Sequence, residues 1–369
     1  MGEKEGKMIH FDHAAATVPL PEAAEFYAER LKYDHFNQEA AHREGFRLRG
    51  ELEKAAERLS GALFPGVPAR AVVWGNSATE LFNLIADSPV FRDRRIAAGK
   101  LEHPALAAAI RRSAAAIHPV ANDCCGRMLP APARSGDIET AVCHAVQSEL
   151  GVRQAPAEFF AAFPGAVKLL DAVQQAGKLP LEAVADLTVI SGVKFGSPVG
   201  AALLVDPAWR GAERFLAFAR DYRHRDYRMG RVSFASAATL AFAAGLRARR
   251  LAADLDRISE LNRRLRAGAL RLGMEPTVPE DSASPYILHL SLRREPGAVI
   301  VRMLSEAGIL AASGSACAAE SPDPSPALRA IGRSREAAYR GLRLSFGFDT
   351  SAADADFLLT TLEKVLKNF

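Results

Sequence analysis

The sequence predicts an α/β fold with a mainly parallel sheet, and three observations lead to this prediction. Short apolar segments rich in β-branched residues alternate with helical patterns as far as residue 250, as expected when strands are joined by crossover helices. The pattern then changes to an arginine-rich helix, short strands and a closing helix. The length of 369 residues suits about two domains.

The first part of the chain supplies the main sheet and its helices. Strands are expected from short apolar runs at Arg70–Trp74, Arg95–Ala98, Thr140–Val146, Ala166–Leu170, Leu187–Ser191 and Gly200–Val205. Helices are expected where apolar residues recur at three- and four-residue steps or alanine is frequent, at Glu51–Leu63, Pro104–Ile117 and Ser236–Leu251.

The second part supplies a smaller unit. A helix carries Ile258, Leu261, Leu265 and Leu270 on one face. It is followed by a strand, a helix, two strands and a final helix, expected at Pro285–Leu292, Val299–Ala307, near Ile309, Leu342–Phe346 and Ala352–Leu366. We therefore expect a large domain over residues 15–250, and a small domain formed by residues 1–14 and 251–369.

Composition narrows the class of protein. The net charge of +4 is small and dispersed, which argues against nucleic-acid binding or an acidic membrane surface. No apolar run reaches the roughly 18 residues of a membrane-spanning helix, and the charged segment Met1–Lys7 does not read as a signal peptide. The cysteines show neither a Cys-x-x-Cys pair nor zinc-ligand spacing. We expect a cytoplasmic protein with reduced thiols and no bound metal.

One turn is a candidate phosphate-binding site. The strand that ends at Trp74 breaks at Gly75, and a helix is expected to begin near Ala78. Ser77 and Thr79 would then present hydroxyls and backbone N–H groups at a helix N-terminus, where anions bind readily. An ordinary N-cap would use the same residues, so both interpretations stay open.

Three further side chains are candidates for catalysis. Asp171 ends an apolar strand, at the edge where ligands gather in open α/β sheets; a helix-capping aspartate is the alternative. Lys194 lies in a Gly- and Pro-rich turn, where desolvation would suit it to Schiff-base formation; a solvated loop lysine is the alternative. Cys317 follows the small-residue run Ala311–Ala316, which favours an exposed thiol over a buried one.

Together and in this order, these segments resemble the class V aminotransferase family of fold-type I pyridoxal-phosphate enzymes. Within it the chain is similar to the group I cysteine desulfurases of the NifS/IscS kind. The resemblance covers nearly the whole chain and is carried by Ile9–Ala16, Lys100–His103, Ser148–Val152, Ser313–Cys317 and Arg343–Gly347. It implies a large domain with a mainly parallel seven-stranded sheet, and a smaller α/β C-terminal domain that carries the cysteine loop.

The resemblance also implies a pyridoxal 5′-phosphate cofactor and assigns residues to it. Lys194 would hold the cofactor as a Schiff base and later move the substrate's Cα proton. Asp171 would pair with the ring nitrogen, and His103 would lie on the ring face and assist proton transfer. The other cofactor-binding residues are expected to be Ser77, Ala78, Thr79, Ser148, Gln174 and Ser191.

The reaction and the partners follow from the same resemblance. Arg343 would bind the carboxylate of L-cysteine through two parallel hydrogen bonds, and Asn37 is a second expected substrate-binding residue. Cys317 would attack the substrate's sulfur, giving a persulfide and releasing L-alanine. The expected partners are a second copy of the chain in a homodimer, and a scaffold or carrier protein that accepts the sulfur, as in iron–sulfur cluster assembly.

The chain departs from the family pattern at positions expected in the site. Val193 stands where the family has a histidine that grips the phosphate. Arg231 replaces a threonine in the segment that reaches the partner subunit's phosphate. Arg231 of the neighbouring subunit is therefore expected to restore the lost contact, unless it belongs to a solvated basic face. Gln147 and Ser148 replace paired asparagines, which leaves the substrate preference open.

Two other functions remain open from the sequence. The chain is alternatively a related lyase or aminotransferase that acts on another amino acid, with Cys317 incidental. A second alternative is a low-turnover protein that binds the cofactor and mainly docks partner proteins. The combination of Lys194, Asp171, His103, Cys317 and Arg343 favours the desulfurase, because a binding module has no need of all five.

Overall fold

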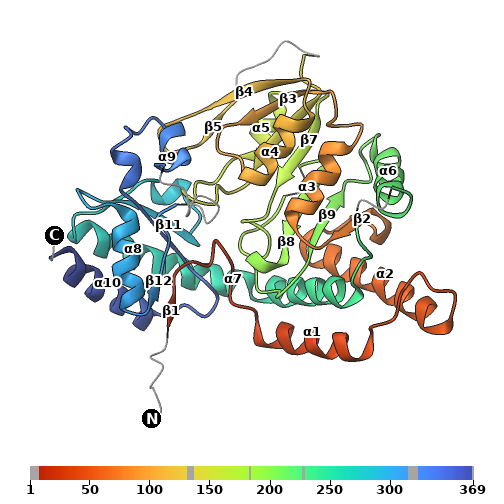
Figure 1. The fold of residues 1–369 in the computed structure, drawn as a ribbon, viewed down its shortest axis with the longest axis horizontal. Helices are drawn as coiled ribbons and strands as arrows, with labels where there is room; N and C mark the ends of the chain where they lie inside the picture. Colours follow the sequence, from red (N-terminus) through yellow and green to blue (C-terminus); the bar gives the residue numbers. More distant parts are fainter. Residues whose placement is uncertain (1–7, 131–136, 183, 227–228, 315–322, 368–369) are drawn as a thin grey trace.

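The computed structural model describes residues 8–130, 137–182, 184–226, 229–314 and 323–367. Within them, an eight-stranded sheet in the order β2-β9-β8-β7-β6-β3-β4-β5 forms the centre of the larger unit (Figure 1). Its strands are β2 (Val72–Gly75), β3 (Arg95–Gly99), β4 (Ala116–Asn122), β5 (Met128–Leu129), β6 (Thr140–His144), β7 (Val167–Asp171), β8 (Leu187–Ser191) and β9 (Ala201–Val205).

The sheet is mainly parallel, as the sequence predicts. Strand β9 runs antiparallel to both β2 and β8, strand β5 runs antiparallel to β4, and the remaining neighbours are parallel. The expected number of seven strands is wrong for the described residues, because the chain turns back after β4 and adds the two-residue β5 at the edge.

Helices cover both faces of this sheet. One face packs against α3 (Ala78–Asp87), α4 (Pro104–Ser113) and α6 (Ala212–His224). The other packs against α1 (Pro21–Tyr33), α2 (Arg43–Leu63), α5 (Pro156–Ala161) and the first half of α7 (Phe234–Arg271). Every residue of β6, β8 and β9 is buried, which is why these strands read as continuous apolar runs.

The smaller unit has a core of its own. It contains an antiparallel sheet of β10 (Glu275–Pro276), β11 (Ile287–Ser291) and β13 (Gly341–Ser345). Strand β1 (Ile9–His10) returns from the start of the chain and pairs in parallel with β12 (Ile309–Leu310). The helices are α8 (Gly297–Glu306), α9 (Pro326–Ala330), α10 (Ala352–Leu366) and the second half of α7.

Some of the predicted helices differ from the structure. The helix expected over Pro104–Ile117 ends at Ser113, because Ala116 and Ile117 begin β4 and pair with β3. The two helices expected on either side of residue 250 are one uninterrupted helix, α7. Along α7, Leu246 packs in the core of the large unit and Ile258 in that of the small unit. We therefore keep the division of the chain near residue 250 as a proposal.

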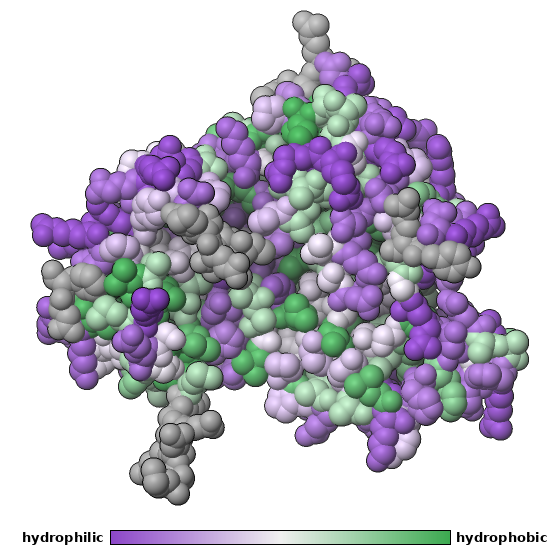
Figure 2. Space-filling model, viewed as in Figure 1, coloured by the Kyte–Doolittle hydropathy of each residue, from purple (hydrophilic) through white to green (hydrophobic). Residues whose placement is uncertain are grey.

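The visible surface is mostly polar. Figure 2 shows hydrophilic residues over most of this face, with hydrophobic ones in small, separate groups. Among the residues that the structure describes, no helix combines the length and the apolar character that crossing a membrane requires.

Candidate active site

A cavity of about 270 Å³ lies where the carboxyl ends of β6, β7 and β8 meet the smaller unit. His144, Asp171 and Ser191 end these three strands and line the cavity. This is the edge of an open α/β sheet at which ligands bind. Ten of the predicted site residues line this one cavity: Ser77, Ala78, Thr79, His103, Ser148, Asp171, Gln174, Ser191, Lys194 and Arg343.

Lys194 ends a single 3₁₀ turn, Gly192–Lys194, directly after β8. The N-terminal segment holds this turn in place: the backbone N–H of Thr17 donates to the Val193 carbonyl at 2.9 Å, and the Thr17 hydroxyl donates to the Lys194 carbonyl at 3.1 Å. The Lys194 Nζ donates to the carbonyl of Ala15. The amine is therefore half-buried inside the cavity rather than in open solvent.

Asp171 lies at the bottom of the same cavity with 7% of its surface exposed. Burial raises the pKa of its carboxyl group to about 6, although a 3.0 Å hydrogen bond from the Val173 N–H favours the charged form. The charge of Glu102 raises this pKa further, and the charges of His144 and Lys194 lower it. A buried carboxylate of this kind is stabilised by a cationic partner placed in the cavity.

His103 combines a structural and a site role. It is the N-cap of α4, and its Nδ1 accepts the N–H of Ala105 at 3.2 Å. In the neutral ring the proton is therefore on Nε2. Burial, and then the nearby charge of Lys194, lowers the pKa of the His103 imidazole. A neutral imidazole beside the amine of Lys194 is able to take part in proton transfer.

The N-terminus of α3 forms another wall of the cavity. Ser77 caps this helix, since its hydroxyl accepts the N–H of Glu80 at 3.2 Å. The N–H groups of the first turn, at Ala78 and Thr79, have no acceptor within the helix, and both residues line the cavity. Ser77 can therefore cap the helix while the N–H groups of Ala78 and Thr79 bind an anion. Val193, which replaces the expected histidine, also lines the cavity.

Arg343 comes from β13 of the smaller unit and is 1% exposed. Its Nη1 donates to the Ser148 carbonyl at 3.0 Å, and its Nη2 donates to Asp12 Oδ1 at 2.5 Å. Its Nε has no hydrogen-bond partner among the described residues. The sequence predicts Arg343 and Ser148 in the site, but not the ion pair with Asp12.

Lys178 is a second buried lysine that sequence reasoning missed. It is 1% exposed, and its Nζ donates to Gln174 Oε1 at 3.2 Å. The Gln174 Nε2 in turn donates to the Ala14 carbonyl at 2.9 Å. Burial, and then the charges of Lys194 and two arginines, lowers the pKa of Lys178 to about 7. This lysine fixes which end of the Gln174 amide is the donor.

A buried acid–base pair next to Asp171 was missed as well. His144 is the strand partner of Asp171, and its Nδ1 lies 3.1 Å from Glu102 Oε1. Gln154 Oε1 accepts the N–H of Met128, so its amide nitrogen faces His144 Nε2 at 3.2 Å. Burial opposes the charged imidazole, but Glu102 and Asp171 outweigh it, and the pKa of His144 is raised. In the sequence, the one signal for this pair is that Glu102 directly precedes the predicted site residue His103.

Three predicted residues are not placed in the cavity. Asn37 is exposed in the connection between α1 and α2, where its side chain accepts the N–H of Glu39. Arg231 is exposed before α7. Neither lines the cavity of this chain, and both assignments stay predictions. Cys317 lies outside the described residues.

Comparison with known proteins gives a consistent result. A family model described as aminotransferase class-V matches residues 9–209. A cysteine desulfurase of Rhodobacter capsulatus is 29% identical, covering 97% of this chain and 96% of that protein. The cysteine desulfurase IscS of Anaeromyxobacter sp. (strain Fw109-5) is 28% identical over 97% of this chain and 93% of its own. A solved NifS-like protein matches 98% of this chain and 100% of its own, with a TM-score of 0.85 at 21% identity.

Proposed function

The chain belongs to the aminotransferase class-V family, and from that premise we propose that it is a pyridoxal-phosphate-dependent cysteine desulfurase. It converts L-cysteine to L-alanine and transfers the sulfur through a persulfide on Cys317. Relatives named cysteine desulfurase align over 97% of the chain. The structural observation that carries the proposal is one cavity that gathers Lys194, Asp171, His103 and Arg343.

The residues of the cavity fit pyridoxal phosphate. The volume of about 270 Å³ is close to the lower end of small-molecule sites, about 300–1,000 Å³. The buried carboxylate of Asp171 suits a protonated ring nitrogen, and the N–H groups of Ala78 and Thr79 suit a phosphate. The Gln174 amide suits the ring oxygen. When bound, the cofactor supplies an aldehyde that condenses with amines, and a ring that accepts electrons from a carbanion.

The substrate's carboxylate is bound by Arg343. The guanidinium lies at the wall of the cavity, and its Nε has no partner among the described residues. A planar guanidinium binds a carboxylate through two parallel hydrogen bonds, a geometry that an ammonium group does not provide. Arg343 therefore holds the carboxylate of the amino acid in the same cavity as the amine of Lys194.

Lys194 and His103 carry out the proton transfers. The Lys194 amine is half-buried in the cavity, where it is placed to remove or return a proton at Cα. Burial, and then the charge of Lys194, lowers the pKa of His103, so the neutral imidazole is favoured beside this amine. Because His103 Nδ1 accepts the N–H of Ala105, its Nε2 is the ring nitrogen that remains for proton transfer.

Cys317 completes the reaction. Its thiolate attacks the sulfur of the substrate: an S–S bond forms, the C–S bond breaks, and the electron pair of that bond stays with the carbon, which is protonated to give L-alanine. The persulfide then transfers its outer sulfur to a thiol of a scaffold or carrier protein. The active form is a homodimer in which Arg231 of one subunit approaches the cofactor's phosphate in the other.

The test is incubation of the cofactor-loaded protein with L-cysteine, with alanine and sulfide measured separately. The wild type is expected to form both, whereas Cys317→Ala forms neither above the uncatalysed background. Alanine formation that does not depend on the thiol would identify a related lyase or aminotransferase. A visible cofactor band without turnover would identify the low-turnover binding protein.

A second variant tests the role of Lys194. Lys194→Ala should lose the visible absorption of the bound cofactor while its thermal unfolding stays close to that of the wild type. Lys168→Ala, which removes a lysine from β7 outside the cavity, is the matched control and should keep the band. Persistence of the band in Lys194→Ala would remove Lys194 from its assigned role.

A further inference from the structure

The substrate-binding arginine is already paired with a carboxylate of this chain. Arg343 Nη2 donates to Asp12 Oδ1 at 2.5 Å, and the Arg343 side chain is 2% exposed against 23% for Asp12. Charge-assisted contacts of this kind are stronger than neutral hydrogen bonds. Any carboxylate that binds Arg343 therefore encounters a guanidinium whose charge is partly neutralised.

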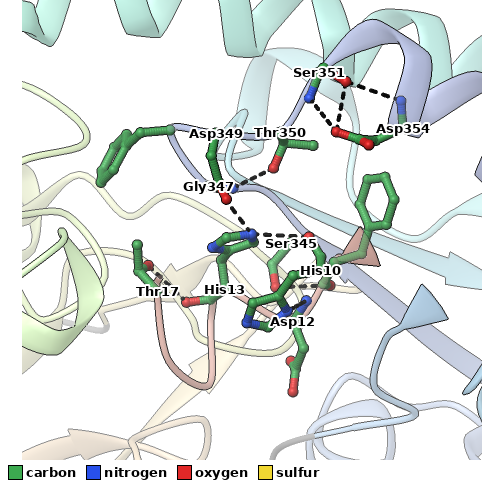
Figure 3. Close-up of polar contacts among 12 residues, drawn as sticks. His10, Asp12, His13, Thr17, Ser345, Gly347, Asp349, Thr350, Ser351 and Asp354 are labelled. Carbon is green, nitrogen blue, oxygen red and sulfur yellow. Dashed lines mark hydrogen bonds and ion pairs between the residues drawn. The ribbon is translucent and has the colours of Figure 1, made fainter. Parts of the chain in front are cut away.

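The position of Asp12 is fixed by its backbone. On one side, the Phe11 N–H donates to the Leu310 carbonyl at 2.8 Å. On the other side, the Ser345 N–H donates to the Phe11 carbonyl at 2.7 Å, and the Ser345 hydroxyl accepts the Ala14 N–H at 2.8 Å. Figure 3 shows Asp12 on this segment beside Ser345. Asp12 also forms an isolated β-bridge with Ser345, so its carboxylate is presented to Arg343 by a backbone that is held on both sides.

The flanking residues add to this fixed arrangement. The Asp12 N–H donates to His10 Nδ1 at 3.1 Å, and the His10 and His13 rings stack with their centroids 4.2 Å apart. Burial, and then the charges of His10 and Lys178, lowers the pKa of His13 to about 3, so this ring is neutral at physiological pH. Arg343 is therefore the cation that the structure pairs with Asp12.

We propose that Asp12 competes with the substrate's carboxylate for Arg343 and so limits the affinity of the site for carboxylate ligands. The proposal rests on the proposed function, in which Arg343 binds the amino acid. The Nε of Arg343 is open to the incoming carboxylate, whereas its Nη2 is shared with Asp12. Two carboxylates at one guanidinium repel each other, so Asp12 weakens the binding of every carboxylate ligand.

Competition by Asp12 and a purely structural role of Asp12 predict opposite changes in KM when its charge is removed. Asp12→Asn keeps the size of the side chain and its backbone hydrogen bonds but removes the negative charge. Because the competitor is lost in the ground state and the transition state alike, KM for L-cysteine should fall about tenfold with kcat nearly unchanged. If Asp12 only held Arg343 in place, the same change would raise KM.

The experiment compares three cofactor-loaded proteins: the wild type, Asp12→Asn and Asp349→Asn. Asp349 is the matched control, because it is a neighbouring carboxylate that lies 3.8 Å from His13 (Figure 3), whereas Arg343 donates to Ser148 and Asp12. KM and kcat are measured with L-cysteine. In parallel, the product L-alanine is titrated into each protein and its binding followed by the visible band of the cofactor.

Tighter binding of L-alanine by about tenfold in Asp12→Asn, with Asp349→Asn unchanged, supports the proposal. Unchanged or weaker binding overturns it. Asp12→Ser is measured in the same way if the asparagine variant does not fold, as judged by its thermal unfolding. The L-alanine titration does not require turnover, so it separates a failure of this proposal from a failure of the desulfurase assignment, in which the wild type would form no alanine.

Discussion

At the scale of single residues, burial determines the chemistry of this site. Asp171 and Lys178 are both more than 90% buried, and burial moves the pKa of each toward neutrality, upward for the acid and downward for the amine. Both groups would be ordinary charges at the surface. In the cavity each is a group whose charge depends on what is bound beside it.

Asp171 should destabilise the cofactor-free protein at neutral pH. Its pKa is raised in the folded state from 3.8 to about 6, so the stability gained from the protonated form is present at low pH and lost as the pH rises through 6. Asp171→Asn should therefore raise the free energy of unfolding by about 2 kcal/mol at pH 7.5, with a smaller gain at pH 5. Urea unfolding of the cofactor-free proteins at both pH values measures this difference. An equal gain at both values would contradict it.

At the scale of elements, α7 joins the two units. Its first half packs in the core of the large unit and its second half in that of the small unit. At the crossing, the buried Arg247 donates to the Gly177 carbonyl at 3.0 Å and to Asp254 Oδ2 at 2.5 Å, and its guanidinium lies 3.4 Å from the centroid of the Phe348 ring. One side chain thus contacts both units at the junction.

A break in α7 at this junction should be costly although the position is exposed. Ala252→Pro removes one backbone hydrogen bond and introduces a clash with the preceding turn, and we expect it to lower the free energy of unfolding by about 3 kcal/mol. Ala252→Gly, the control for helix propensity alone, should lower it by about 1 kcal/mol. Urea unfolding compares the two. If proline were no worse than glycine, the helix would not need to be continuous here.

At the scale of the whole molecule, the cavity is assembled from the start, the middle and the end of the chain. Ala14 and Ala15, Asp171 and Lys194, and Arg343 all line it. In the homodimer that we propose, Arg231 of the second subunit is expected near the phosphate. In one chain Arg231 is exposed and outside the cavity.

Replacement of Arg231 tests this arrangement. Arg231→Thr should weaken cofactor binding about tenfold, because a charge-assisted contact to the phosphate is replaced by a neutral one. Equilibrium dialysis of the cofactor, together with the oligomeric state by sedimentation, provides the measurement. Arg220→Thr removes another arginine of the same basic segment, from α6, and is the control. Unchanged retention of the cofactor by dimeric Arg231→Thr would place Arg231 on a solvated face instead.

Much of the fold and of the site could be predicted because the signals are local. Leu187–Ser191 and Ala352–Leu366 were predicted with the bounds that the structure has, since each is a pure strand or helix pattern. β4 was missed because it contains Pro119 and is mostly exposed, which weakens the strand signal. Lys178 was missed because no pattern of residue types marks a lysine that is buried only by its neighbours.

The sequence by itself determined most of the buried strands, the long helices and the residue types that carry the chemistry, because periodicity and short motifs act over a few residues. Only the tertiary structure decided which of these side chains contact one another. Asp12 and Arg343 are 331 positions apart in the chain, and Gln174 meets Ala14 across 160. Such pairs form when the segment after β1 bridges β13 in the smaller unit and the edge of the large sheet meets them, and no local sequence pattern specifies contacts between segments so far apart.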